Sequence, residues 1–452
     1  MAEDAAIVCS RRGWRVLRRP DLRLPAAAIA VFAIFAGLYY WARPVYEFAL
    51  TWYGIAPFRF PFLDTDAITA AIECYRQGID VYIANPCDAL GRPHVYSPLW
   101  LAASVLPVTR AWTMPIGLGL DLAFLLSLAA IPVPAQARDR RIMLAAVFST
   151  MTIYAVERGN NDLFVFLLVL LAGLTLASPA VWNGSSIRRW WGYLLIATAA
   201  LLKFYPVSAL IVSCRERRHA FIAINLLMLS VICVFVAIVK DDLKHTAALI
   251  PFGSYYTDLF GAKNLPYGIA HLIYTPSREF IVDFVPPLLL AILCLRALWL
   301  AIGLAQRPAL HTAFLKLEER ARIWLILGSA IITACFFAGQ SAGYRGVFFL
   351  LVLPGLFGLA QCAEDDQAAR LVRQAPWLIL FVMWSEALRH AIVAVGPGWL
   401  VIEATFWIAK ELVWWRIIAT LGGVLLCFVL ASPVWRRGSA DRAATAEQVA
   451  GA

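Results

Sequence analysis

The chain has 452 residues, of which 62% are hydrophobic and only 15% are charged. Soluble domains carry roughly a quarter charged residues, so this composition excludes a large soluble enzyme. Apolar runs long enough to cross a bilayer recur from end to end, and the short alternating segments of an outer-membrane barrel are absent from the sequence. The formal net charge is +10. The basic residues stand in short clusters beside apolar runs, which is typical of membrane orientation signals rather than of a nucleic-acid-binding face.

The two ends of the chain are expected to lie in the cytoplasm. Residues 1–22 are rich in arginine and precede the first apolar run. Because basic clusters stay on the cytoplasmic side, this end is predicted to be cytoplasmic, and the first run is expected to remain as an anchor. Residues 436–452 are alanine-rich and polar and are expected to form a disordered cytoplasmic tail. Between them, residues 23–435 are predicted to form one transmembrane domain.

The first external loop is predicted to cover residues 43–97. It is polar although apolar runs flank it, and membrane proteins keep such residues mainly where they meet water, a partner or a substrate. A short helix is expected within it, with Asp64 or Asp66 as its N-cap and Gly78 as its C-cap. Cys74 and Cys87 lie in the same loop, and an oxidising compartment would allow them to form a disulfide.

The apolar segment 98–109 decides the topology of everything after it. Pro98 and Pro107 bound it, and it is too short for a regular span, so we interpret it as re-entrant or interfacial. The alternative is a short full crossing, which would place Arg138 and its basic neighbours outside. Without that crossing they fall inside, as the distribution of basic residues favours.

The rest of the chain then divides into further apolar spans with short connections. Counting the first span, a spanning-length criterion predicts about twelve crossings, some of them short. Residues 191–202 and 207–214 are expected to be half-helices broken at Pro206, and residues 403–415 an amphipathic stretch at the external surface. The later spans are expected at 113–133, 142–156, 163–181, 191–202, 207–214, 220–239, 280–304, 323–337, 347–360, 377–395 and 417–431.

This orientation rests on the basic clusters alone, yet it gathers many polar groups on one side. Such convergence is what a site at one membrane face requires. The residues placed outside are Asp64, Asp66, Glu157, Arg158, Asn160, Asn161, Asp162, Lys203, Tyr205, His245, Lys263, Asn264, His271, Gln340, Tyr344 and Arg345.

Several of these residues also have ordinary structural interpretations. Asp162 suits a helix start through capping and the helix dipole. Lys203 lies deep in an apolar run, where it either snorkels or faces a pocket formed at the following Tyr-Pro. An external Arg345 opposes the orientation bias, which favours a partner or an anionic ligand. His245 has the position of an ordinary loop histidine. The sequence contains no metal-ligand spacing, Gly-rich phosphate loop or Ser/His/Asp order.

A set of short motifs is spread along the chain. They are Asp64, Gly78-Ile79-Asp80-Val81-Tyr82, Tyr96-Ser97-Pro98, Gly159-Asn160-Asn161-Asp162, Leu202-Lys203-Phe204-Tyr205-Pro206, Tyr344-Arg345 and Leu353-Pro354-Gly355. At these motifs the sequence resembles glycosyltransferase family 87, which comprises multi-pass, polyprenol-phosphate-dependent mannosyltransferases of the C-type glycosyltransferase fold. Two substitutions depart from the family pattern: Val81 stands for the usual Pro, and Asn160 for the usual Gln. The segment 85–92 is not a general family feature.

The resemblance implies an all-α bundle of the C-type glycosyltransferase kind in the plasma or inner membrane, with its site on the periplasmic or extracellular side. It implies an inverting transfer of a mannose-type sugar from a polyprenyl-phosphate donor, with neither metal nor cofactor. The acceptor would be a hydroxyl of a glycolipid or polysaccharide. Family spacing selects Asp64 as the general base. Lys203, Arg345 and Arg158 are expected to bind the donor phosphate, and Asp66, Asn160, Asn161, Tyr205, Tyr344 and His245 the sugar or acceptor.

Three other functions compete with this hypothesis. A transporter or lipid-linked-sugar flippase would show paired broken helices in two repeats, whereas the sequence shows one broken segment and no repeat. A non-catalytic subunit would keep the fold without needing Asp64. A polymerase or ligase of surface polysaccharide would differ in its acceptor.

Overall fold

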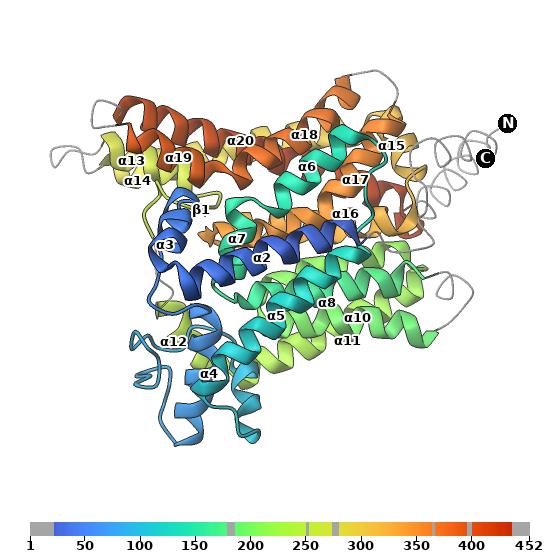
Figure 1. The fold of residues 1–452 in the computed structure, drawn as a ribbon. Coiled ribbons are helices and arrows are strands. Elements are labelled where there is room, and N and C mark those ends of the chain that lie inside the picture. Colours follow the sequence, from blue (N-terminus) through green and yellow to red (C-terminus); the bar gives the residue numbers. More distant parts are fainter. Residues whose placement is uncertain are drawn as a thin grey trace, which may run out of the picture.

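The computed structural model describes residues 22–178, 186–249, 253–273, 280–363, 367–395 and 400–435. Helices dominate these residues, and most of them run roughly side by side in one bundle (Figure 1). The chain is therefore an all-α polytopic membrane protein. The expected cytoplasmic ends, 1–22 and 436–452, lie outside the described residues apart from Leu22.

The elements alternate long helices with short 3₁₀ segments, which carry the label η. The first half contains α2 (Arg23–Trp41), α3 (Arg43–Trp52), α4 (Leu63–Arg76), η1 (Pro98–Val105), η2 (Arg110–Trp112), α5 (Thr113–Ser127), η3 (Leu128–Ala130), α6 (Ala137–Val147), α7 (Thr150–Glu157), α8 (Asn161–Leu176), α10 (Ser186–Leu202) and η4 (Tyr205–Arg215). The second half contains α11 (Arg218–Ile238), α12 (Lys240–Leu249), α13 (Asn264–Ile273), α14 (Phe280–Ala305), α15 (Pro308–Leu315), α16 (Glu319–Ala338), η6 (Gly343–Phe348), α17 (Phe349–Cys362), α18 (Gln367–Met383), α19 (Ser385–Ala394) and α20 (Leu400–Ala431).

Two short strands connect distant loops. Strand β1 (Leu259–Phe260) pairs antiparallel with β2 (Ser341–Ala342), with Leu259 opposite Ala342. The pairing joins the segment after α12 to the segment just before η6. It therefore fixes the approach to Arg345.

By length and composition, seven helices in the described part of the chain are able to cross a membrane, or up to nine if each of two bent pairs is one span. The expectation of about twelve crossings is therefore not confirmed. The seven are Arg23–Trp41, Arg110–Ala130, Arg218–Ile238, Asp283–Ala305, Glu319–Ala338, Gly343–Cys362 and Val401–Ala431. The bent pairs are Ala137–Glu157 with Asn161–Leu176, at 118°, and Ala369–Met383 with Ser385–Ala394, at 53°.

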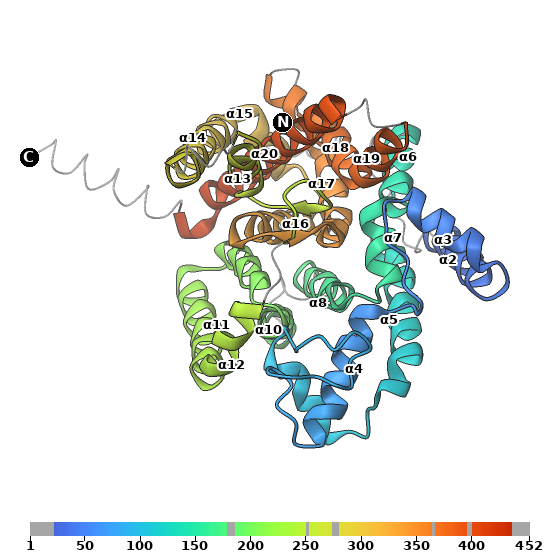
Figure 2. The ribbon, with the colours of Figure 1, turned by 90° about the vertical axis from the view of Figure 1, so that its left-hand side faces the viewer.

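The best-buried helices lie at the centre of the bundle. Figure 2 shows α16 between α8 and α10 on one side and α17 and α20 on the other. Trp324 of α16 is fully buried and its Nε1 donates to the Leu170 carbonyl at 3.2 Å. Gly173 leaves the room that this indole needs, because a Cβ there would lie 2.1 Å from Trp324 Nε1. This core supports the polar groups at the end of the bundle where α4 lies.

The expected break near Pro206 is confirmed. Helix α10 ends at Leu202 and η4 begins at Tyr205, so Lys203 lies in the gap between them. The segment 98–109 is also short, as expected: η1 is an eight-residue 3₁₀ helix, far below spanning length. Two breaks of regular structure thus occur beside the predicted site residues.

Two sequence-based expectations are wrong. Residues 403–415 are not a separate surface stretch, because α20 is continuous over 32 residues. Lys410 and Glu411 within it are buried; Lys410 Nζ donates to the Thr257 carbonyl at 2.6 Å and pairs with Glu411 at 3.3 Å. These two charged side chains contact other protein groups rather than water. The expectation was wrong because charged residues next to apolar ones are typical of a surface helix.

The start of α4 is the second correction. Neither Asp64 nor Asp66 is the N-cap: Phe62 holds that position with a left-handed φ of +61°, and both aspartates lie in the first helical turn. At the other end, Gln77 is the C-cap, one residue earlier than expected, and Gly78 follows it with φ +79°. Acidic residues in a first turn are favoured by the helix dipole without capping it, which explains the error.

Candidate active site

The segment before α4 lies directly against the turn between α7 and α8. The Phe62 amide donates to the Glu157 carbonyl and the Asp64 amide to the Arg158 carbonyl, both at 3.0 Å. Gly159 completes this turn with φ +52°, and a Cβ there would lie 2.6 Å from Thr65 Oγ1. The close approach therefore requires glycine and fixes Asp64 at the start of α8.

Asp64 is a half-buried residue whose carboxylate accepts a hydrogen bond from Asn160 Nδ2. Asn160 is also the N-cap of α8, since its Oδ1 accepts from the Asp162 amide at 2.7 Å. Burial raises the pKa of Asp64 above its usual 3.8, while the Asn160 hydrogen bond and the charges of Arg158 and Lys203 act in the opposite direction. Asp64 is thus a stronger base than a free carboxylate in water.

Asp162 binds the predicted cations. Its fully buried carboxylate lies 2.8 Å from Lys203 Nζ and 3.6 Å from Arg345 Nε, and it accepts a hydrogen bond from the Tyr205 hydroxyl. Arg345 Nη1 also donates to Ser341 Oγ at 2.6 Å. One carboxylate therefore joins α8, the gap after α10, and η6.

Aromatic rings surround the two cations. Lys203 Nζ lies 5.6 Å from the ring centre of Tyr96 and 5.9 Å from that of Tyr344, and Arg345 Cζ lies 5.2 Å from that of Tyr205. These distances allow cation–π attraction. Ser97 Oγ donates to the Leu201 carbonyl at 2.6 Å, which holds the Tyr96 segment against the end of α10.

Arg158 is the most enclosed of the three predicted phosphate-binding cations. Its Nε lies 3.2 Å from Glu157 Oε2, and its Nη2 donates to the Ala56 carbonyl at 3.1 Å. Its guanidinium also lies over Phe58, 4.3 Å from the ring centre. Only 4% of Arg158 is exposed, so these contacts assign it mainly to holding the incoming loop.

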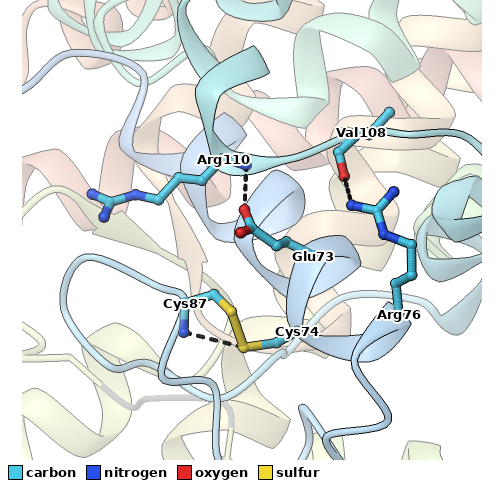
Figure 3. Close-up of a disulfide and its surroundings, with 6 residues drawn as sticks. All are labelled: Glu73, Cys74, Arg76, Cys87, Val108 and Arg110. Atoms are coloured by element: carbon cyan, nitrogen blue, oxygen red, sulfur yellow. Dashed lines mark hydrogen bonds between the residues drawn. A yellow bond between two sulfur atoms is a disulfide. The ribbon is translucent and has the colours of Figure 1, made fainter.

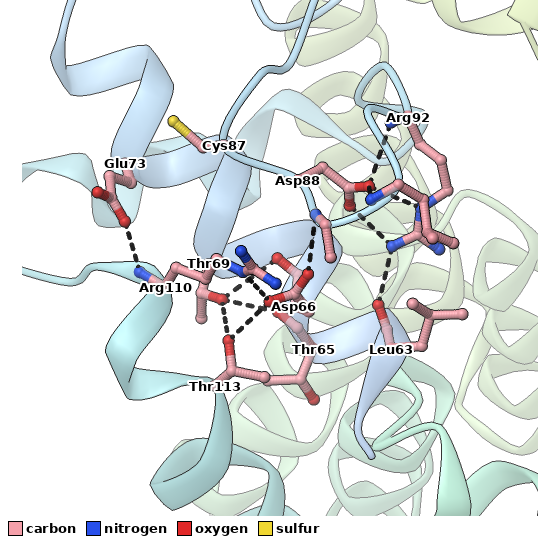
Figure 4. Close-up of polar contacts among 12 residues, drawn as sticks. Leu63, Thr65, Asp66, Thr69, Glu73, Cys87, Asp88, Arg92, Arg110 and Thr113 are labelled. Atoms are coloured by element: carbon pink, nitrogen blue, oxygen red, sulfur yellow. Dashed lines mark hydrogen bonds and ion pairs between the residues drawn. The ribbon is translucent and has the colours of Figure 1, made fainter. Parts of the chain in front are cut away.

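Asp66 belongs to a separate polar cluster, drawn in Figure 4. It is buried, pairs with Arg110 Nε at 2.8 Å and accepts from Thr113 Oγ1 at 3.3 Å. The Ala89 amide also donates to it at 3.4 Å. These partners tie α4 to the start of α5 and to the turn around Asp88.

The remaining predicted residues are Tyr205, Tyr344, Asn161 and His245. Tyr205 and Tyr344 lie beside Lys203 and Arg345, as given above. Asn161 is 2% exposed, and neither side-chain atom makes a hydrogen bond within the described residues. His245 lies exposed on α12, and among the described contacts none joins it to Asp64 or to the cations.

A disulfide fixes the loop beside Asp64. Cys74 of α4 is bonded to Cys87, a pairing that the sequence allowed but left open (Figure 3). The following turn is held by Asp88, which accepts from the Leu90 amide at 2.8 Å and pairs with Arg92 Nη2 at 2.7 Å. Arg92 Nη2 also donates to the Leu63 carbonyl at 3.0 Å, one residue before Asp64.

Sequence analysis missed two contributors to this site. We interpreted Asp162 as a structural residue. An acidic residue at a helix start looks the same in the sequence whether it interacts with the helix dipole or binds cations from distant segments. No sequence pattern pointed to Arg92, because its role depends on the disulfide and on the turn at Asp88. No group of three or more metal-ligating side chains was found in the described part of the chain.

No protein-family model matches the chain, and neither the curated proteins nor the solved structures compared with it give a significant match.

The Cys74–Cys87 bond gives a first prediction. It closes a short loop, so replacing both residues by Ala is expected to destabilise the native loop by about 3 kcal/mol through loop-closure entropy. The measurement is thermal unfolding of the purified protein in detergent, without reductant. Cys233→Ala, in the exposed face of α11, is the control and is expected to leave the transition unchanged. An unchanged transition in the double variant would contradict the structural role.

Proposed function

We propose that the protein is a membrane glycosyltransferase that moves a mannose-type sugar from a polyprenyl-phosphate donor to an acceptor hydroxyl, with inversion, on the external side of the plasma or inner membrane. The observation that carries the proposal is the carboxylate of the half-buried residue Asp64, which lies beside a cluster containing two cations, Lys203 and Arg345. The resemblance to glycosyltransferase family 87 supports the same reaction.

Asp64 acts as the general base. Its carboxylate takes the proton of the acceptor hydroxyl while the hydroxyl oxygen forms a bond to the anomeric carbon of the sugar. The bond from that carbon to the phosphate oxygen breaks, and its electron pair leaves with polyprenyl phosphate. A base works best when its pKa approaches the working pH, so the raised pKa of Asp64 favours this role.

Lys203 and Arg345 stabilise the leaving phosphate. Both cations contact the single carboxylate of Asp162, which leaves one positive charge in excess in this cluster. The 3.6 Å approach of Arg345 to Asp162 is loose for an ion pair, and 24% of the Arg345 side chain is exposed. A partly exposed guanidinium with excess positive charge suits a phosphate oxygen that gains charge as the bond breaks.

Amide and hydroxyl groups next to the base are suited to sugar hydroxyls. Asn161 offers a buried amide without a hydrogen bond in the described chain, and such a group gains most from a ligand. Tyr344 lies near Lys203 and packs edge-on against Tyr154 at 5.4 Å between ring centres. A tyrosine there is able to pack on a sugar face and bind a hydroxyl.

The bends of the helices do not favour a transporter. Alternating access in a repeat architecture calls for equivalent broken helices in two halves. The two bent pairs differ strongly, at 118° and 53°, and the first is the turn that carries Asn160. The transferase hypothesis uses that turn, whereas a flippase hypothesis leaves the Asp64–Asn160 contact without a purpose.

The second prediction separates the two neighbouring aspartates. Asp64→Asn is expected to lower sugar transfer by about 10²- to 10⁴-fold, the usual contribution of a general base. Asp66→Asn breaks the pair with Arg110 and is expected to lower thermal stability, while the folded fraction keeps transfer within a few-fold of wild type. Transfer is measured with radiolabelled polyprenyl-phosphate mannose and a membrane acceptor extract. Loss of transfer in Asp66→Asn with activity kept in Asp64→Asn would overturn the assignment.

The third prediction concerns pH. Asp64 must be ionised to accept a proton, so transfer is expected to fall as the pH drops through its pKa, which burial raises above 3.8. Asn160→Ser keeps a capping oxygen for α8 but removes the amide donor that stabilises the charged carboxylate. The pKa of Asp64 then rises further, and the acid limb of kcat/KM shifts to higher pH.

The matched control for the pH experiment is Asn161→Ser, which alters the adjacent amide without touching Asp64. Its acid limb is expected to coincide with that of wild type. A limb in Asn160→Ser that stays in place or shifts to lower pH would contradict the role of Asp64 as the titrating base.

A further inference from the structure

An apolar cavity lies between α2, α3, α5 and the α6–α7 segment. It contains about 790 Å³ of space, part of it open to the outside, and almost all of its lining is apolar. Figure 2 shows α2 and α3 beside α5 and α7 at the edge of the bundle. Helices α2 and α5 are of membrane-spanning character, and the α6–α7 segment belongs to a bent pair that is a further candidate span, so lipid chains are expected to reach this part of the bundle.

The lining determines which kind of molecule fits. Ala28, Phe32 and Ala36 face it from α2, and Leu118 and Leu125 face it from α5. A buried water needs two or more polar partners, and apart from a few groups such as Thr152 and Glu157 these walls are apolar, so a hydrocarbon chain is the suitable occupant. Helix α2 is otherwise little covered by protein, with 17% of its span buried, which leaves the cavity reachable from the bilayer.

One end of the cavity reaches the candidate active site. Phe62 and Glu157 both line it, and they are joined by the hydrogen bond from the Phe62 amide to the Glu157 carbonyl. The next hydrogen bond along the chain is that of Asp64 to Arg158. The polar end of a molecule whose chain fills the cavity would therefore lie next to the segment that carries Asp64.

The charge at this end distinguishes the two lipids of the proposed reaction. The charged side chain in the lining is Glu157, a carboxylate, whereas the cations suited to the donor phosphate, Lys203 and Arg345, contact Asp162 on α8. The lining contains no Lys or Arg to bind a phosphate, and the nearby Arg158 already pairs with Glu157 at 3.2 Å. The end of the cavity thus suits a hydroxyl rather than a phosphate.

We propose that this cavity binds a hydrocarbon chain of the acceptor, so that the acceptor is a membrane lipid with a neutral, hydroxyl-bearing head group. The inference rests on the proposed function, because it assigns one side of Asp64 to the acceptor. The donor enters from the side of Lys203 and Arg345, and the acceptor hydroxyl meets Asp64 from the side of Phe62. The acceptor is then a glycolipid rather than a soluble polysaccharide.

The test uses photoreactive lipids and variants that fill the cavity. The first probe is a diacylglycerol monoglycoside with a diazirine in one acyl chain, and the second is a polyprenyl phosphate with a diazirine in its chain. Ala36→Phe fills the cavity from α2 and Leu118→Trp from α5. Ala33→Phe adds the same ring to α2 at an exposed position outside the lining and is the matched control. Cross-linked residues are identified by mass spectrometry in the full-length purified protein.

The glycolipid is expected to label lining residues of α2 and α5, with labelling at least fivefold lower in Ala36→Phe and Leu118→Trp but unchanged in Ala33→Phe. Excess polyprenyl phosphate should not compete. Equal labelling in all variants, or stronger labelling of these residues by the polyprenyl phosphate, would overturn the proposal. Labelling does not require sugar transfer, so a failure of the proposed function, seen as transfer kept in Asp64→Asn, is distinguishable from a failure of the lipid site.

Discussion

The buried carboxylate of Asp162 is the constraint on which the site depends. A charge with no solvent exposure is stable only with close partners, and the partners of Asp162 come from two distant parts of the chain: Lys203 and Tyr205 at the break after α10, and Arg345 in η6. Because α10 ends at Leu202, Lys203 lies in the break before η4, and from there it contacts Asp162. The strand pair before η6 fixes the segment from which Arg345 reaches the same carboxylate.

Asn160 connects the start of α8, which carries Asp162, to Asp64. Its side chain caps α8, two residues before Asp162, and its amide holds the Asp64 carboxylate. The turn at Gly159 lets the segment before α4 approach closely enough for both contacts. Asn160, which caps α8, therefore also orients the candidate base Asp64. The disulfide and the Asp88–Arg92 pair fix the other side of the same segment.

Much of this arrangement follows from the sequence, and the exceptions have physical causes. Basic clusters predicted that Asp64, Lys203 and Arg345 share one side, and they gather around one site. The role of Asp162 was not predictable, because its partners lie more than forty residues away. Lys410 and Glu411 suggested a surface because their partners, including the Thr257 carbonyl, come from a distant loop. The expected number of spans is not confirmed, since short apolar runs such as η4 form 3₁₀ helices below spanning length.

The central claim is that Lys203 and Arg345 form the phosphate site, and binding of polyprenyl phosphate without a sugar tests it most directly. Asp162→Asn keeps both cations and is expected to bind the lipid at least as tightly as wild type. Lys203→Met/Asp162→Asn differs from it only by the loss of one charge. Its affinity is expected to be at least about tenfold weaker, because a charge-assisted hydrogen bond contributes about 1.5–3 kcal/mol. Equal affinity of the two variants would contradict the assignment of the phosphate site.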